Sequence, residues 1–314
     1  MGRASRFRCG GGGALAQVSF LWVIFTIVAA AGQTARNAMQ RELTASLGSV
    51  GATHVRFLFG FPFALLFLAV VMAVNKLGLP HTDWRFWAWN VAGALTQIGG
   101  TALMLKTMTE RSFVVTVAYL KTEPLFVAGI GLFLPHETLT AGMVVAMVIA
   151  IAGVVLISLR SRVADSGGIH SALYGLTAGG MFAVSAIGYR YAILSLQLPG
   201  YVMAATFTLA VGLVIQAAVL TAWLAIVDAK VLRAIFRLWR PSLLAGLMGS
   251  AASEFWFLAF ALATAASVRT LGLIDVLFAQ MVSHILFKQK TTAREAAGIA
   301  LLVGGAVLLV YSHK

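Results

Sequence analysis

Two acidic residues lie inside apolar stretches of the sequence, where an ionised side chain is unusual. Glu123 lies in the segment Tyr119-Leu-Lys-Thr-Glu-Pro124, two residues after Lys121. Asp275 lies in a second apolar stretch 152 residues later, and Arg269 precedes it by about one and a half helical turns. A charge in hydrocarbon costs roughly 3 kcal/mol or more, so such residues usually face a bundle interior or a wet cavity and carry function. The chemistry to expect is therefore binding of a polar solute or a proton.

The composition indicates a membrane protein. Of the 314 residues, 60% are hydrophobic and 11% are charged, whereas a soluble domain is about 25% charged. The single cysteine, Cys9, excludes a disulfide framework and a cysteine-based metal cluster. The net charge of +13 comes from basic residues scattered between apolar runs rather than gathered on one face, so we expect no nucleic-acid partner.

Several apolar runs approach the ~20 residues that a helix needs to cross a bilayer. Backbone groups in hydrocarbon must be hydrogen-bonded within their own segment, so we expect helices, and the runs are too long for barrel strands. The fold class is therefore an all-α polytopic membrane protein with ten transmembrane helices. Their expected spans are 18–36, 55–75, 86–105, 113–134, 139–159, 169–189, 200–227, 241–262, 268–287 and 294–312.

The spans divide into two halves of five helices, and an odd number per half turns the second half upside down. A weak repeat supports this division, because Glu123-Pro-Leu-Phe126 aligns with Asp275-Val-Leu-Phe278. We divide the chain into an N-terminal tail and two repeats, at 1–17, 18–160 and 161–314. A signal peptide ending near Ala29-Ala-Ala-Gly32 is the alternative for the start, but the many spans that follow favour a retained first helix.

These motifs resemble the EamA domain of the drug/metabolite transporter superfamily. Glu123-Pro-Leu-Phe126, a short break and a span ending in Ala152-Gly-Val-Val-Leu156 are similar to its proline-started span, Leu-Gly-Glu-Arg turn and glycine-bearing helix. At the turn this chain has Leu134-Pro-His-Glu137, so only the glutamate matches, and the second copy, Phe287-Lys-Gln-Lys290, lacks it. The resemblance covers the chain after Gln17. It implies ten helices in two inverted EamA-like repeats around a central cavity that opens alternately to each side.

The candidate substrate-binding residues are polar or aromatic side chains within or bordering the spans. We expect Lys121, Arg269 and Arg36 to attract a carboxylate or phosphate, and Glu123 and Asp275 to bind an ammonium group or a coupling proton. A carboxyl group away from water keeps its proton more readily, which makes it a usable proton carrier. The full set is Tyr119, Lys121, Glu123, Arg269, Asp275, Glu254, Gln97, Gln33, Arg36, Gln280 and Trp256.

Helical geometry limits which of these side chains can meet. Tyr119 and Glu123 are four residues apart and share a helix face, whereas Lys121 lies about 200° round the helix from Glu123. Lys121 and Glu123 are therefore not expected to point into one cavity. The alternative for the charged residues is a set of internal salt bridges that lock the repeats together, for example Glu254 with Arg269.

Some polar residues are as well explained by the membrane surface or by packing. Arg36 equally fits the end of its helix at the interface, and we expect His54 and Arg56 to be interfacial. A lone glutamine is more often a contact between helices than a ligand. The stretch from Lys230 to Arg240 has the pattern of a short amphipathic helix on the membrane surface.

Motifs of enzymes and ATP-driven pumps are missing from the sequence. His136-Glu137 begins a His-Glu-x-x-His pattern, but Thr140 occupies the position of the second histidine. There is no Gly-x-Ser-x-Gly and no glycine-rich loop with lysine that would hold a phosphate. We expect no enzymatic activity, no metal and no cofactor.

The sequence therefore predicts a secondary transporter, an exporter or exchanger, of a small polar or amphipathic metabolite such as an amino acid or cofactor precursor. Its expected partners are this solute, a coupling proton and membrane lipid, in a bacterial-type inner (plasma) membrane, as a monomer or homodimer. The alternatives are a flippase for a lipid-linked metabolite and a non-transporting membrane scaffold or sensor. Basic residues gather after odd-numbered spans, which places both termini outside, whereas the resemblance implies both inside, so the orientation stays open.

Overall fold

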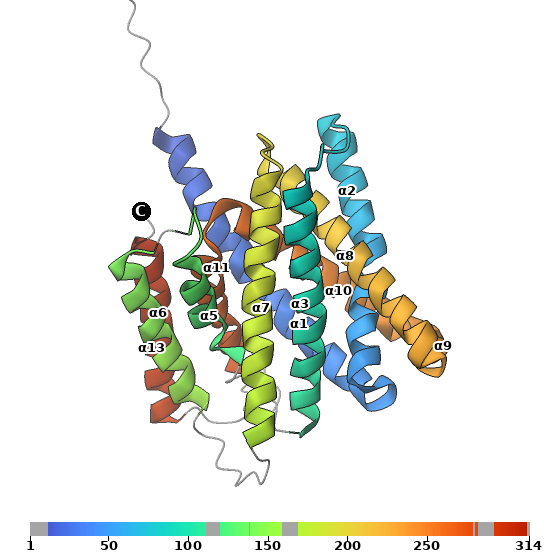
Figure 1. The fold of residues 1–314 in the computed structure, drawn as a ribbon. Coiled ribbons are helices and arrows are strands. Elements are labelled where there is room, and N and C mark those ends of the chain that lie inside the picture. The colour runs from blue at the N-terminus through green and yellow to red at the C-terminus, as the bar shows by residue number, and fades with distance from the viewer. Residues whose placement is uncertain are drawn as a thin grey trace, which may run out of the picture.

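The computed structural model describes residues 12–110, 120–137, 139–158, 169–278, 280–281 and 292–312. These residues form helices and their connections, with no strand among them, and the helices stand side by side as one bundle (Figure 1). In this part of the chain, four helical segments are long and apolar enough to cross a membrane: Phe20–Asn75, Tyr201–Val227, Trp239–Leu262 and Ala293–Ser312. The apolar helix Ala141–Ile157 is shorter.

The first two spans are joined by helix rather than by a loop. Helix α1 runs over Gly12–Leu58, and α2 follows at Phe61–Asn75. Only Gly48 breaks α1, with φ 68° and ψ 173°, a conformation that residues with a Cβ rarely adopt. Gln40 Nε2 donates to the carbonyl of Ala52 at 3.1 Å and ties the two limbs of α1 together across this break.

The expected end of the first span near residue 36 was therefore wrong. Residues 37–47 are mostly good helix formers, among them alanine, methionine, glutamine and leucine, so nothing stops the helix before Gly48. The limb after the break, 49–58, is largely buried instead of lying at the membrane surface. This limb carries His54 and Arg56 into the bundle.

Most of the other helices begin and end within a few residues of the expected spans, except that α3 continues five residues further and α7 six. They are α3 (Trp84–Glu110), α6 (Ala141–Ser158), α7 (Ile169–Ser195), α8 (Tyr201–Val227), α10 (Trp239–Leu262) and α13 (Ala293–Ser312). The expected amphipathic segment forms α9, Ala229–Arg237, with Ile235 buried and Arg233 and Arg237 exposed. Asp228 caps α9 by accepting from the Val231 N–H at 3.3 Å.

The two expected spans that carry the acidic residues are interrupted. Lys121 and Thr122 form a turn before α5, Glu123–Gly131. In the second half, α11 (Ala265–Leu271) passes through the short 3₁₀ helix η1 (Gly272–Ile274) into helical residues 275–278. Irregular backbone at membrane depth is tolerated only where protein or a wet cavity surrounds it.

Three helix pairs make the most extensive contacts in the bundle: α1 with α10, α3 with α7, and α6 with α13. The pair α6 and α13 touches through glycine. A Cβ on Gly153 would lie 2.6 Å from the carbonyl oxygen of Gly298, and a Cβ on Gly298 would lie 2.8 Å from that of Gly153. Only a missing side chain on both helices lets their backbones come so close.

Candidate functional site

A cavity of about 80 Å³ lies at the centre of the bundle. Its walls come from α1, α3, α7 and α10 and from the two interrupted spans. Eight of the expected binding residues line it: Gln33, Arg36, Gln97, Lys121, Glu123, Trp256, Arg269 and Asp275. A cavity of this volume has room for several water molecules.

Two ion pairs cross this cavity. Lys121 Nζ donates to both carboxylate oxygens of Asp275, and Arg269 Nε donates to Glu123 Oε1. All four side chains are 11–13% exposed. The Arg269 guanidinium also lies 4.8 Å from the centre of the Trp256 ring, a cation–π contact. Each pair joins a residue of the first half of the chain to one of the second.

The expectation that Lys121 and Glu123 could not face one cavity was wrong. It assumed a continuous helix, but Lys121 lies in the turn and Glu123 in the first turn of α5. A turn frees the two side chains from helical spacing, so both line the cavity. The suggested salt bridge between Glu254 and Arg269 is also absent, because Arg269 pairs with Glu123.

Arg36 and Arg56 are buried rather than interfacial. Each is 3% exposed, and both line the cavity from the two limbs of α1. The aliphatic parts of both arginine side chains pack against Gly249 of α10. A Cβ added at Gly249 would lie 3.3 Å from Arg36 Cδ and 3.4 Å from Arg56 Cγ. His54 is fully buried as well, with Nε2 3.0 Å from Thr221 Oγ1. These positions follow from the helical continuation of α1 past residue 36.

The remaining expected binding residues are placed less centrally. Gln97 accepts from Gln216 Nε2 at 2.8 Å, so it joins helices as well as lining the cavity. Glu254 accepts from Thr206 Oγ1 at 2.5 Å and points toward α8 rather than into the cavity. Gln280 is partly buried but does not line the cavity, and Tyr119 lies outside the described residues.

Several lining residues were missed in the sequence. Phe182, Ser185 and Tyr189 follow one face of α7 at spacings of three and four residues, and Ser253 and Phe257 do the same on α10. This helical spacing was the available signal. It is shared by every packed helix face, so it does not by itself separate a cavity wall from core.

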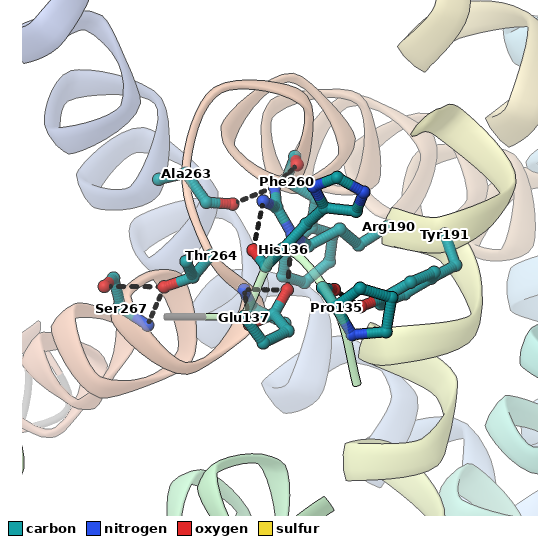
Figure 2. A network of polar contacts seen from close by, with 10 residues as sticks. Pro135, His136, Glu137, Arg190, Tyr191, Phe260, Ala263, Thr264 and Ser267 are labelled. Carbon is teal, nitrogen blue, oxygen red and sulfur yellow. Dashed lines mark hydrogen bonds and ion pairs between the residues drawn. The ribbon is translucent and has the colours of Figure 1, made fainter. Parts of the chain in front are cut away.

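A second polar network lies where the loop after α5 meets the connection from α10 to α11 (Figure 2). The Glu137 side chain is fully buried and accepts from Arg190 Nε and from the Ala265 N–H, the latter at 3.0 Å. Arg190 also donates to the carbonyls of Phe260 and Ala263. Glu137 is the glutamate of the turn motif, and its carboxylate holds three segments of the chain together.

This network contacts the linings of both the central cavity and a hollow on the protein surface. Phe260, whose carbonyl accepts from Arg190, lines the cavity. Pro135, His136 and Tyr191 line the hollow, which has a volume of about 370 Å³. The Tyr191 hydroxyl donates to the carbonyl of Pro135, so the rim of the hollow is bonded to the same loop.

The comparisons with known proteins agree with this geometry. Residues 20–159 match the EamA-like transporter family. This match covers most of the first half of the chain. A solved crystal structure of a protein superposes with a TM-score of 0.68 at 14% identity, over 95% of this chain and 97% of its own, which shows a shared fold. No protein with a curated function matches the chain.

The EamA match and the apolar helices together show a multi-pass membrane protein of the drug/metabolite transporter type. A protein of this family has a small-molecule solute and membrane lipid as partners.

Proposed function

We propose that the chain is a secondary transporter of a small polar or amphipathic metabolite, such as an amino acid or cofactor precursor. It works by alternating access, as an exporter or exchanger, in a bacterial-type plasma membrane. The observation that carries this proposal is the central cavity in which Lys121–Asp275 and Arg269–Glu123 pair across the two halves. Ion pairs between moving halves are contacts that a solute or a proton can replace.

The pattern of helix contacts supports ten spans in two inverted repeats, at 18–160 and 161–314. In this scheme the first repeat contains α1, α2, α3, α5 and α6, and the second contains α7, α8, α10, α11 with η1, and α13. The first helix of each repeat then packs on the third helix of the other, as α1 with α10 and α7 with α3. The fourth helices contact each other, and so do the fifth, α6 and α13. Such reciprocal pairing is what a two-fold axis in the membrane plane produces.

The network around Glu137 supplies a closed end for alternating access. It bonds the first half of the chain, at Glu137, to the second half, at Arg190 and Ala265. Opening this end requires that Glu137 leave Arg190 and Ala265, which connects the cavity with the hollow beyond. Closing it again excludes water from the solute.

Glu123 is the proposed proton carrier. Protonation of its carboxyl group cancels the attraction to Arg269 and frees the guanidinium for a solute. The test is solute flux into proteoliposomes driven by an imposed pH gradient, with labelled amino acids and small organic acids as probes. We expect Glu123→Gln to abolish proton-driven flux while the protein still inserts. Glu254→Gln, a buried acid outside the cavity, is the matched control, and unchanged flux in Glu123→Gln excludes Glu123 from coupling.

A flippase for a lipid-linked metabolite is the second candidate. The observation that favours it is an apolar hollow of about 360 Å³ on the side of the bundle, lined by residues of α1, α13 and the α11–η1 segment. Ile274, the neighbour of Asp275, belongs to this lining. Flux of free solute into vesicles supports the transporter, whereas movement of only a lipid-linked probe between leaflets supports the flippase. A scaffold with a sealed core is disfavoured by the cavity.

A further inference from the structure

The cavity contains two arginines that lack an acidic partner. Arg36 Nη2 donates to Asn37 Oδ1 at 2.9 Å, but its Nε and Nη1 have no hydrogen-bond partner in the described part of the chain. Arg56 reaches Thr101 Oγ1 and Ser253 Oγ only at 3.4 Å, and its Nε has no partner there. A buried donor without an acceptor costs free energy, and in a cavity this cost is removed when water or a bound solute accepts from the donor.

The charges around the cavity do not balance. Of the described residues that line it, four are cationic and two are carboxylates, which leaves two positive charges uncompensated. They are Arg36, Arg56, Lys121 and Arg269 against Glu123 and Asp275. A guanidinium does not give up its proton in a protein, so the excess cannot be removed by neutralising the arginines. The excess positive charge therefore favours the binding of an anion in the cavity.

We propose that the transported solute is an organic anion whose carboxylate or phosphate group lies between Arg36 and Arg56. This inference rests on the proposed transport function and narrows its substrate class. The planar guanidinium matches the two oxygens of a carboxylate or phosphate. Two arginines from the two limbs of α1 hold the anion, and the Gly48 break sets their positions.

The same cavity disfavours a zwitterion such as a neutral amino acid. An ammonium group would first have to displace Arg269 from Glu123 or Lys121 from Asp275, whereas an anion finds donors of Arg36 and Arg56 that have no partner in the described part of the chain. The rest of the wall is aromatic, with Phe182, Trp256 and Phe257 among its members. The solute therefore combines a charged group for the arginines with a carbon skeleton for the aromatic rings.

The first test is ligand-induced thermal stabilisation of the purified full chain, because a ligand that binds only the folded form raises its melting temperature. The probes are succinate, glycerol 3-phosphate, leucine, putrescine and glycerol, at matched ionic strength. Anionic and neutral lipid vesicles form a further arm that separates a lipid headgroup from a free anion. We expect saturable stabilisation by an anion alone. A response to leucine or putrescine instead, or no response to any anion, overturns the anion assignment.

Variants distinguish specific binding from a general salt effect. Arg36→Gln and Arg56→Gln are each expected to weaken anion binding about tenfold or more, since each removes a charge-assisted hydrogen bond. Without ligand, both variants are expected to be as stable as the parent or more stable, because an uncompensated buried charge is gone. If either arginine instead served only to stabilise the fold, its replacement would lower the melting temperature of the ligand-free protein. Arg36→Lys keeps the positive charge but loses the planar pair of N–H donors, so we expect its affinity for the anion to lie between those of the parent and Arg36→Gln. Arg233 is exposed on α9, and Arg233→Gln is the control, which must bind the anion as the parent does.

Transport assays separate failure of this inference from failure of the proposed function. Flux of leucine or putrescine, but of no anion, leaves the transporter intact and overturns the anion assignment. Anion binding that depends on Arg36 and Arg56, without flux of any probe into proteoliposomes, supports the binding site and contradicts transport. Anion flux that Arg36→Gln and Arg56→Gln abolish supports both.

Discussion

Removal of the Glu137 carboxylate is expected to open the central cavity toward the surface hollow. In this structure the Glu137 side chain is fully buried, and its carboxylate pairs with Arg190 and accepts from the Ala265 N–H. The change Glu137→Ala leaves the Arg190 charge buried without its counter-ion, at 8% exposure of that side chain. Breaking a buried pair by removing one partner costs about 3–5 kcal/mol.

That cost falls on the closed state, because an open end exposes both groups to water. At about 1.4 kcal/mol per factor of ten, the open population rises by roughly 10²- to 10³-fold or more. Glu137→Gln keeps an acceptor for the Ala265 N–H and loses only the charge, so its effect is smaller. An exposed carboxylate, Asp228, offers the control Asp228→Asn, for which we expect no opening.

The assay is the rate at which a thiol reagent labels a cysteine inside the cavity. Cys9→Ser removes the native thiol, and Ser185→Cys places a small reporter among the buried lining residues. When opening is rare, the labelling rate follows the open population. We expect labelling to accelerate at least about a hundredfold in Glu137→Ala until opening is complete. A rate within threefold of the parent would refute the assignment of Glu137 as a closing contact.

Three further changes test the packing and the charges. Gly298→Val is expected to destabilise the protein by about 1–3 kcal/mol through overpacking against α6, and to lower the melting temperature. Gly304→Val on the same helix, where an added Cβ meets nothing within 4 Å, should have little effect, and equal losses would contradict the proposed contact. Glu254→Gln should leave both thermal stability and solute flux near the parent level, since Glu254 points away from the cavity. A loss of flux in this variant would show that Glu254 takes part in transport. Asp275→Asn should lower the melting temperature by leaving Lys121 unpaired, and adding Lys121→Gln should restore it, whereas additive losses would show that the two side chains are not coupled.

The sequence alone was enough for much of the architecture. The lengths of the apolar runs predicted α3, α6, α8, α10 and α13 to within a few residues, apart from the longer C-terminal end of α3. These lengths are decided by the bilayer, whose thickness acts on each segment separately. The same physics selected Glu123 and Asp275 as candidate site residues, because a charge inside an apolar segment can be recognised without knowing the fold, and both residues line the central cavity. The motif Glu123-Pro-Leu-Phe126, the glutamate of the turn and the span ending in Ala152-Gly-Val-Val-Leu156 together led to the EamA family, which the match over residues 20–159 confirms.

Only the tertiary structure decided which of the buried charges meet. Arg269 pairs with Glu123 rather than Glu254, and Lys121 shares a cavity with Glu123, because the chain turns at 121–122 and α11 packs beside α5. Arg56 lies in the centre because α1 continues past residue 36 and folds back at Gly48. Hydrophobicity depends on each segment by itself, whereas the partner of a charged side chain depends on residues more than a hundred positions away.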